Sequence, residues 1–188
     1  PPQSDVQKGG SALNRFTFTQ YHMGVDARIV LFSGSEATAE AAAEAAFKRI
    51  AELEAIMSDY RKDSELMLLC DKAGSGPVKV SADLMRVLKK GQEVSRASHG
   101  AFDVTVGPLI QLWRAARRAK KLPTVLQVSS ARDLVGWQMM KLDLSSRTVS
   151  LAKKGMRLDL GGIAKGDAAQ EAMKALVRQG VKSAMVEM

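Results

Sequence analysis

Apolar and polar residues alternate in two short runs near the start of the chain. Residues 15–19 (Arg-Phe-Thr-Phe-Thr) alternate strictly, and part of Ala27–Phe32 does the same. A period of two is typical of a β-strand with one buried face. The runs therefore predict two strands joined through Tyr21–Gly24. Residues 1–14 are mostly polar and predict a flexible tail before a folded domain at 15–188.

Longer segments carry apolar residues at helical spacing. Between Ala39 and Met57 they recur every three or four residues, and Ser33 or Ser35 stands where an N-cap is expected. Capping residues, prolines in first turns and helical spacing predict four further helices. These begin at about 82, 108, 123 and 165, the first of them stopping before Gly100 and the last running to Gln179.

The remaining apolar runs are short and predict strands. They are Val78–Val80, Met140–Leu144, Thr148–Leu151, Met156–Leu160 and Val181–Met188. The predicted strands come in neighbouring pairs, and helices interrupt them irregularly. This order favours an α+β fold with mostly antiparallel sheets packed against helices over a doubly wound parallel sheet.

Composition narrows the class of protein. The chain has 188 residues, of which 46% are hydrophobic and 26% charged, as in a soluble globular protein. The single Cys70 excludes an intramolecular disulfide, and His22 and His99 are far apart in the sequence. A metal would therefore be bound by oxygen ligands, which points to magnesium or calcium.

The net charge of +8 is densest in residues 114–121, which carry five of the chain's Lys and Arg residues. Such a run can bind nucleic acid or an anionic surface. However, only 5% of residues are aromatic and none is interleaved with the run, so a single-strand stacking platform is not expected. We interpret the run as a solvated helix end and expect no nucleic-acid partner.

Residues 158–166 (Leu-Asp-Leu-Gly-Gly-Ile-Ala-Lys-Gly) place a carboxylate, two adjacent glycines and a lysine between a predicted strand and a predicted helix. A glycine-rich turn before a helix lets backbone N–H groups approach an anion such as a phosphate. Strand–Gly-Gly–helix corners also occur for packing reasons alone. Taken by itself, the motif leaves both interpretations open.

Four stretches together resemble the FAD:protein FMN transferase family (ApbE-like flavin transferases), and the resemblance spans about residues 15–188. They are Met23-Gly24, 58–60 with Ser64-Glu65, 100–109 with Leu112-Trp113, and 158–166. The resemblance implies an ApbE-like, T-fold-related architecture. It also implies a magnesium-dependent, exported enzyme at the periplasm or cell surface, joined to the membrane only through a removed N-terminal lipid anchor. Family members transfer the FMN half of FAD to a Thr or Ser of an acceptor protein and release AMP.

The resemblance also implies roles for individual residues. The positions that match those surrounding FAD are Met23, Tyr60, Ala101, Phe102, Asp103, Asp159 and Lys165, and Gly162 matches a position whose carbonyl coordinates the metal. Each residue has a structural alternative. Met23 and Phe102 are ordinary core residues, Asp103 and Thr105 could cap the next helix, and Asp159 could be solvated. Ser58 could end a helix, and Ser64 could form a local turn.

Three departures from the family pattern affect these expectations. Val25 stands where a Thr is usual, and Asp167, where Tyr is usual, adds negative charge near the expected phosphates. The chain also ends at Met188, where the family continues toward an Asp and a Ser or Thr that complete the metal site. We therefore expect an N-terminal portion of a longer protein that is inactive alone. A non-catalytic flavin-binding module and a magnesium-dependent FAD pyrophosphatase are the alternatives.

Overall fold

The computed structural model describes residues 13–188, so the predicted tail lies almost wholly outside the described part. The described chain forms two compact units. The first contains the residues up to Ile50 together with Ala169–Met188, and the second contains Ala51–Ala168. Within residues 13–188, no helix combines the length and the apolar character needed to cross a bilayer.

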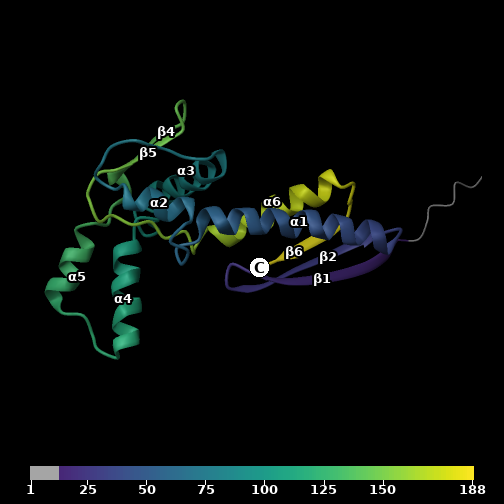
Figure 1. Ribbon diagram of the computed structural model, residues 1–188, viewed down its shortest axis with the longest axis horizontal. Helices are drawn as coiled ribbons and strands as arrows, with labels where there is room; N and C mark the ends of the chain where they lie inside the picture. The colour runs from purple at the N-terminus through teal and green to yellow at the C-terminus, as the bar shows by residue number, and fades with distance from the viewer. Residues whose placement is uncertain (1–12) are drawn as a thin grey trace, which may run out of the picture. The chain divides into compact units, whose positions relative to one another are not determined.

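The first unit is a three-stranded antiparallel sheet with helical cover (Figure 1). Strand β1 (Asn14–His22) pairs with β2 (Val25–Ser33), which pairs with β6 (Ala184–Glu187), so the order is β1-β2-β6. Alternate residues of β2, including Ala27, Ile29 and Leu31, are fully buried. The predicted hairpin and the predicted last strand are therefore confirmed.

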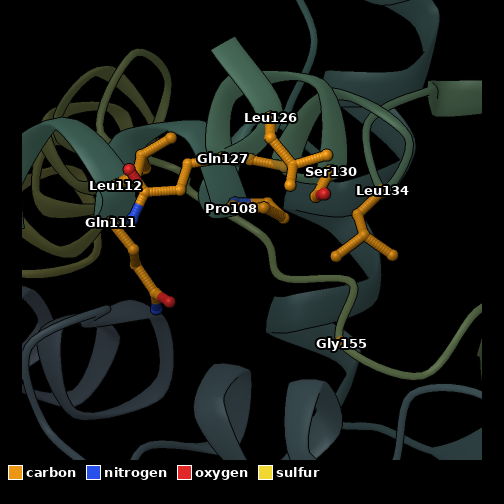
Figure 2. Close-up of a pocket in the computed structure, with 9 residues that line it drawn as sticks. Pro108, Gln111, Leu112, Leu126, Gln127, Ser130, Leu134 and Gly155 are labelled. Atoms are coloured by element: carbon orange, nitrogen blue, oxygen red, sulfur yellow. The ribbon is translucent and has the colours of Figure 1, made fainter. Parts of the chain in front are cut away.

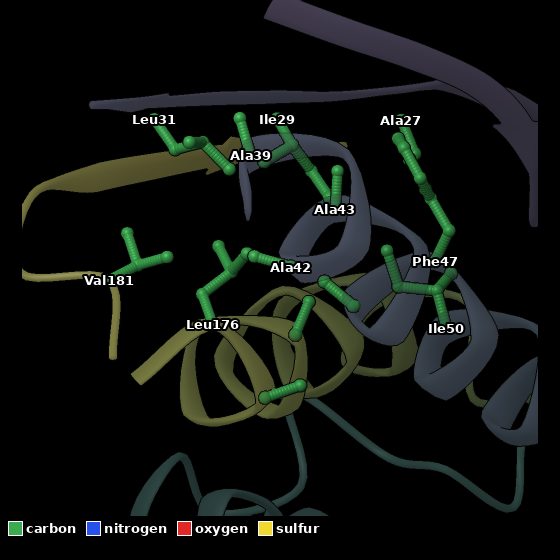
Figure 3. Close-up of a cluster of buried hydrophobic side chains, with 13 residues drawn as sticks. Ala27, Ile29, Leu31, Ala39, Ala42, Ala43, Phe47, Ile50, Leu176 and Val181 are labelled. Carbon is green, nitrogen blue, oxygen red and sulfur yellow. The ribbon is translucent and has the colours of Figure 1, made fainter. Parts of the chain in front are cut away.

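One apolar cluster holds the first unit together (Figure 3). It joins β2 to α1 (Glu36–Met57) and to α6 (Ala164–Arg178). Small residues of α1, such as Ala39 and Ala43, face the sheet, while Phe47 and Leu176 fill the space between elements. As predicted, Ser35 begins α1, since its Oγ accepts a bond from the N–H of Thr38 at 3.3 Å.

The second unit contains four helices and a small antiparallel sheet (Figure 1). The helices are α2 (Glu65–Asp71), α3 (Ala82–Ala97), α4 (Gly107–Ala119) and α5 (Val125–Arg132). The sheet has the order β3-β5-β4, from β3 (Val78–Lys79), β4 (Met140–Asp143) and β5 (Thr148–Leu151), and a 3-10 turn at Trp137–Met139 precedes β4. Both sheets are antiparallel, as the α+β prediction requires.

The predicted starts of α3 and α5 are confirmed, whereas α2 was not predicted from the sequence. Ser81 caps α3 by accepting from the N–H of Leu84 at 3.1 Å. Thr124 caps α5, which ends at Arg132, in a reciprocal box with Gln127. At the end of α3 the first left-handed residue is His99 (φ 54°), while the Gly100 N–H donates to the Ser95 carbonyl at 2.8 Å.

The predicted strand at Met156–Leu160 is wrong. Its apolar residues Met156, Leu158 and Leu160 are buried, which explains the alternation. However, the Leu158 N–H donates to Sγ of Cys70 at 3.3 Å, where a strand would bond to a neighbouring strand. A single parallel bridge, Val106 to Arg157, accompanies this segment. Residues 156–160 are therefore an extended segment that packs against the loop before α4.

Candidate functional site

The third and fourth motifs, residues 100–109 and 158–166, lie against each other in the second unit. The Asp159 N–H donates to the Val104 carbonyl at 2.8 Å, beside the bridge between Val106 and Arg157. A Cβ at Gly107 would lie 2.6 Å from the Arg157 carbonyl oxygen, so only glycine permits this approach. The structure therefore brings together two segments that are about 50 residues apart in the sequence.

Phe102 and Gly162 form a second contact between these motifs. A Cβ at Gly162 would lie 3.0 Å from Cε2 of Phe102, so the phenyl ring rests beside the glycine-rich turn. Phe102 is half-buried and Ala101 is exposed. The core interpretation of Phe102 is therefore only partly correct, because the residue is half-buried and absent from the buried core.

Asp103 organises the loop on which it lies. Its Oδ1 accepts from the N–H and the hydroxyl of Thr105 at 2.8 and 2.7 Å, and its Oδ2 accepts from the Trp137 N–H at 2.8 Å. Thr105 is buried, and its Oγ1 accepts from the Gly136 N–H at 2.8 Å. Neither side chain caps α4, whose N-cap Val106 has no side-chain bond. The capping alternative is therefore wrong, and Asp103 and Thr105 tie the 103–106 loop to residues 136–137.

The glycine-rich turn leaves backbone groups open at the start of α6. Asp159 Oδ1 accepts from the Gly161 N–H at 2.8 Å and stabilises the turn. None of the backbone bonds found within residues 13–188 uses the N–H groups of Lys165 and Gly166 or the carbonyl of Gly162. Lys165 is half-buried, and within the same residues its ammonium group has no ion-pair partner. Two open N–H groups and a cation at a helix start suit an anion.

Asp167 is ion-paired beside this turn. The Arg86 guanidinium donates to both of its carboxylate oxygens, at 3.2 Å from Nε and 2.8 Å from Nη2. Arg86 also pairs with Asp83 on α3. Asp167 therefore carries its negative charge as part of a two-point ion pair, while Arg86 is shared with Asp83. The effect of this charge on a nearby phosphate stays a prediction.

The second motif forms a turn after α1. Ser58 follows the last residue of α1 and accepts from the N–H groups of Tyr60 and Arg61, each at 3.3 Å. Ser64 donates to the Ser58 carbonyl at 2.6 Å and caps α2 by accepting from the Met67 N–H at 3.1 Å. The predicted helix end at Ser58 and local bond at Ser64 are both confirmed. Tyr60 at the crest of this turn is 78% exposed.

Arg114 of α4 connects the turn at Tyr60 to the glycine-rich turn. Its Nη1 bonds to Asp59 Oδ2, and its Nη2 lies 3.3 Å from Asp159 Oδ2. Its Cζ lies 4.5 Å from the centroid of the Tyr60 ring. Burial lowers the pKa of Arg114, but the hydrogen bond to Asp59 and the charges of Asp59 and Asp159 outweigh burial and raise it. Arg114 is thus a fixed cation.

Arg114 was not identified from the sequence as a residue of this site. The interpretation of 114–121 as a solvated helix end is correct for Arg117, Arg118 and Lys120, which are exposed. It is wrong for Arg114, whose partners lie 55 and 45 residues away along the chain. Local charge spacing carries no signal for contacts of that separation.

Met23 belongs to the first unit. It forms the two-residue hairpin turn between β1 and β2 with Gly24, at φ values of 50° and 80°. Such a turn requires positive φ at both central positions, which explains the glycine. Met23 is half-buried rather than part of the apolar core.

The described residues include a candidate metal ligand but no cluster of ligand side chains. Within residues 13–188, no three His, Cys, Asp or Glu side chains cluster as a set of metal ligands. The Gly162 carbonyl accepts none of the backbone bonds found within residues 13–188, and it is an oxygen donor of the kind that magnesium prefers. An oxygen donor at this position fits the chemistry of magnesium, but one carbonyl alone does not make a metal site.

A groove of 620 Å³ lies between α4 and α5 (Figure 2). Pro108 and Leu112 of α4 line one side, and Leu126 of α5 and the following Leu134 line another. None of the residues predicted to bind FAD lines it. The groove is therefore separate from the arrangement of Tyr60, Arg114, Asp159 and Lys165.

Comparison with known sequences identifies relatives. Residues 23–188 match the ApbE family. The FAD:protein FMN transferase of Treponema pallidum is 30% identical over 186 residues, covering 96% of this chain and 51% of the relative. The protein of that name from Haemophilus influenzae is 32% identical over 156 residues, covering 80% of this chain and 45% of the relative. The chain thus spans about half the length of the curated relatives it matches.

Solved structures of similar fold belong to the same family as the related sequences. Flavin transferase ApbE from Vibrio cholerae superimposes with a TM-score of 0.85 at 26% identity, covering 94% of this chain and 58% of that one. Flavinyl transferase ApbE from Pseudomonas stutzeri in its apo form superimposes with a TM-score of 0.84 at 26% identity. The match covers 94% of this chain and 56% of that one. The predicted ApbE-like α+β fold is therefore confirmed.

Proposed function

Because the chain belongs to the ApbE family, we propose that its gene product transfers FMN from FAD to a Thr or Ser hydroxyl of an acceptor protein and releases AMP. Relatives named FAD:protein FMN transferase support the reaction. The observation that carries the proposal is the convergence of three motifs in one unit. Asp159 bonds to Val104 of the third motif and, through Arg114, to the turn of Asp59 and Tyr60.

The reaction exchanges one phosphorus–oxygen bond for another. The acceptor hydroxyl oxygen bonds to the FMN phosphorus, and the bond from that phosphorus to the bridging oxygen breaks. AMP leaves with the bridging oxygen, while the hydroxyl proton passes to solvent or to the AMP phosphate. Such a transfer depends mainly on positioning and charge neutralisation, so no cysteine or histidine nucleophile is needed.

The described residues supply binding and positioning groups for FAD. In our proposal the N–H groups of Lys165 and Gly166, with the Lys165 ammonium, hold the diphosphate at the start of α6. The accessible rings of Tyr60 and Phe102 contact the planar parts of the nucleotide. Asp159 accepts hydrogen bonds beside them, and Ala101 and Asp103 shape the adjoining loop. Met23 is proposed to contact FAD on the family resemblance alone.

Magnesium is the proposed metal, with the Gly162 carbonyl as one of its ligands. When bound, it would neutralise charge on the diphosphate during transfer. Export and lipid anchoring at the periplasm or cell surface are also proposed, on the family resemblance alone. Fractionation of cells that express the full-length gene product tests this, since recovery in the cytosol would contradict export.

The decisive experiment incubates the full-length gene product with FAD, Mg²⁺ and acceptor proteins from the same source. We expect one AMP for each acceptor that gains a covalently bound, fluorescent flavin. A matched reaction without Mg²⁺ should give neither product. Failure to release AMP or to label any acceptor, by a protein shown to bind FAD, would overturn the transferase proposal and leave the non-catalytic flavin-binding module.

The FAD pyrophosphatase alternative is separated by its products. Water would replace the acceptor hydroxyl, so AMP would appear with free FMN in equal amount. Chromatography of the same reaction distinguishes free FMN from protein-bound FMN. AMP matched entirely by free FMN, with acceptors present, would favour the pyrophosphatase.

A further inference from the structure

Arg114 occupies one face of an otherwise exposed aromatic ring. The guanidinium carbon lies 4.5 Å from the Tyr60 ring centroid, within the range of a cation–π contact. Tyr60 remains 78% exposed, so the opposite face of the ring is accessible. An aromatic side chain with one face occupied and the other open can stack a planar ligand on the open face alone.

Two carboxylates hold the guanidinium in this place. Asp59 bonds to Nη1 and Asp159 to Nη2, and these side chains are only 20% and 13% exposed. Asp159 is itself fixed, because its Oδ1 accepts from the Gly161 N–H at 2.8 Å. Arg114 is therefore anchored to the glycine-rich turn while it lies on Tyr60.

We propose that Arg114 is a positioning residue for the flavin nucleotide: it holds the Tyr60 ring so that a planar heterocycle stacks on the ring's open face, beside the glycine-rich turn. This rests on the proposed function of the site. Arg114 acts through Tyr60, and its two carboxylate partners leave it little capacity to neutralise a phosphate. A planar delocalised cation is required, since lysine cannot bond two carboxylates and stack at once.

The test measures affinities of the full-length gene product for riboflavin, FMN and FAD, with Mg²⁺ present. R114Q and R114K should each weaken all three by roughly fivefold, the size of a cation–π contact at a partly exposed site. R117Q, on the same helix but exposed, is the matched control and should change none of them. Equal loss for riboflavin is the key result, because riboflavin carries no phosphate.

A cycle with Y60L tests whether Arg114 acts through Tyr60. In the Y60L background, R114Q should weaken flavin binding by less than twofold. Loss confined to FMN and FAD would overturn the proposal and make Arg114 a phosphate ligand. Unchanged affinities with a lowered melting temperature would also overturn it and make the residue structural. If the wild-type protein binds no flavin at all, that result contradicts the proposed function itself, and the Arg114 proposal falls with it.

Discussion

At the scale of single residues, the candidate site contains two kinds of polar group. Some already have hydrogen-bond partners within the protein, and others have none among residues 13–188. Asp103 has both oxygens occupied by Thr105 and Trp137, so it acts through the shape of its loop. Lys165, in contrast, has an ammonium group without an ion-pair partner in residues 13–188. The open groups are where a ligand would change the balance of interactions, and their substitution should affect binding more than folding.

Replacing Lys165 by alanine should therefore raise the KM for FAD by about tenfold, since a hydrogen bond to a charged group contributes about 1.5 kcal/mol. Steady-state kinetics of AMP release by the full-length gene product measures this. Lys141→Ala, at an exposed position of β4, is the control. Equal KM values for both variants would remove Lys165 from the site.

Gly107 and Gly166 should respond in opposite directions to alanine. At Gly107 the added Cβ would collide with the Arg157 carbonyl, so unfolding free energy should fall by about 2 kcal/mol or more. At Gly166 a Cβ meets nothing within 4 Å, and helix propensity should add up to about 1 kcal/mol. Urea denaturation of both variants checks the contrast. A stable Gly107→Ala protein would contradict the close packing of the two motifs.

At the scale of elements, local signals predicted the hairpins and every described α-helix except the short α2. Ser81, Thr124 and Pro108 mark helix starts because the physical causes are local: side-chain caps and a proline that lacks an N–H. The Met156–Leu160 segment has the same alternation as a strand, but its backbone partners are Val104 and Cys70. Alternation reports burial, and it cannot tell a strand from an extended loop.

The packing of α1 and α6 on the first sheet gives an element-scale prediction. Phe47→Ala should lower unfolding free energy by about 3 to 5 kcal/mol, because Phe47 is 4% exposed and lies in the shared cluster. Val177→Ala, 63% exposed on α6, should change it by less than about 0.5 kcal/mol. Denaturant titrations of both variants measure their unfolding free energies. Similar losses in the two variants would contradict the described core.

Cys70 reports on the segment that carries the glycine-rich turn. Burial raises the pKa of its thiol, while the Leu158 N–H and the Arg157 charge partly oppose this. A raised pKa in the folded protein means that the thiolate, the reactive form, is scarce up to mildly alkaline pH. Alkylation at pH 8 should therefore proceed only after unfolding, as mass spectrometry with and without urea would show. Rapid alkylation of the folded protein would indicate that 156–160 detaches readily from α2.

At the scale of the whole molecule, two units of different character make up the described chain. The first, held by one apolar cluster, carries Met23, and the second carries the remaining predicted site residues. The resemblance of four ordered motifs predicted the family, whereas Arg114 and its contacts could not be predicted because they depend on tertiary packing. The chain spans about half of its curated relatives, so turnover belongs to experiments on the full-length gene product.

The central claim is that FAD binds where the three motifs of the second unit meet. The most direct measurement is an NMR titration of the ¹⁵N-labelled full-length gene product with FAD and Mg²⁺. We predict that the largest amide shifts fall at 58–60, 101–103 and 161–166, including Gly162 and Lys165. Shifts confined to the groove between α4 and α5, or no shifts at saturating FAD, would contradict the account.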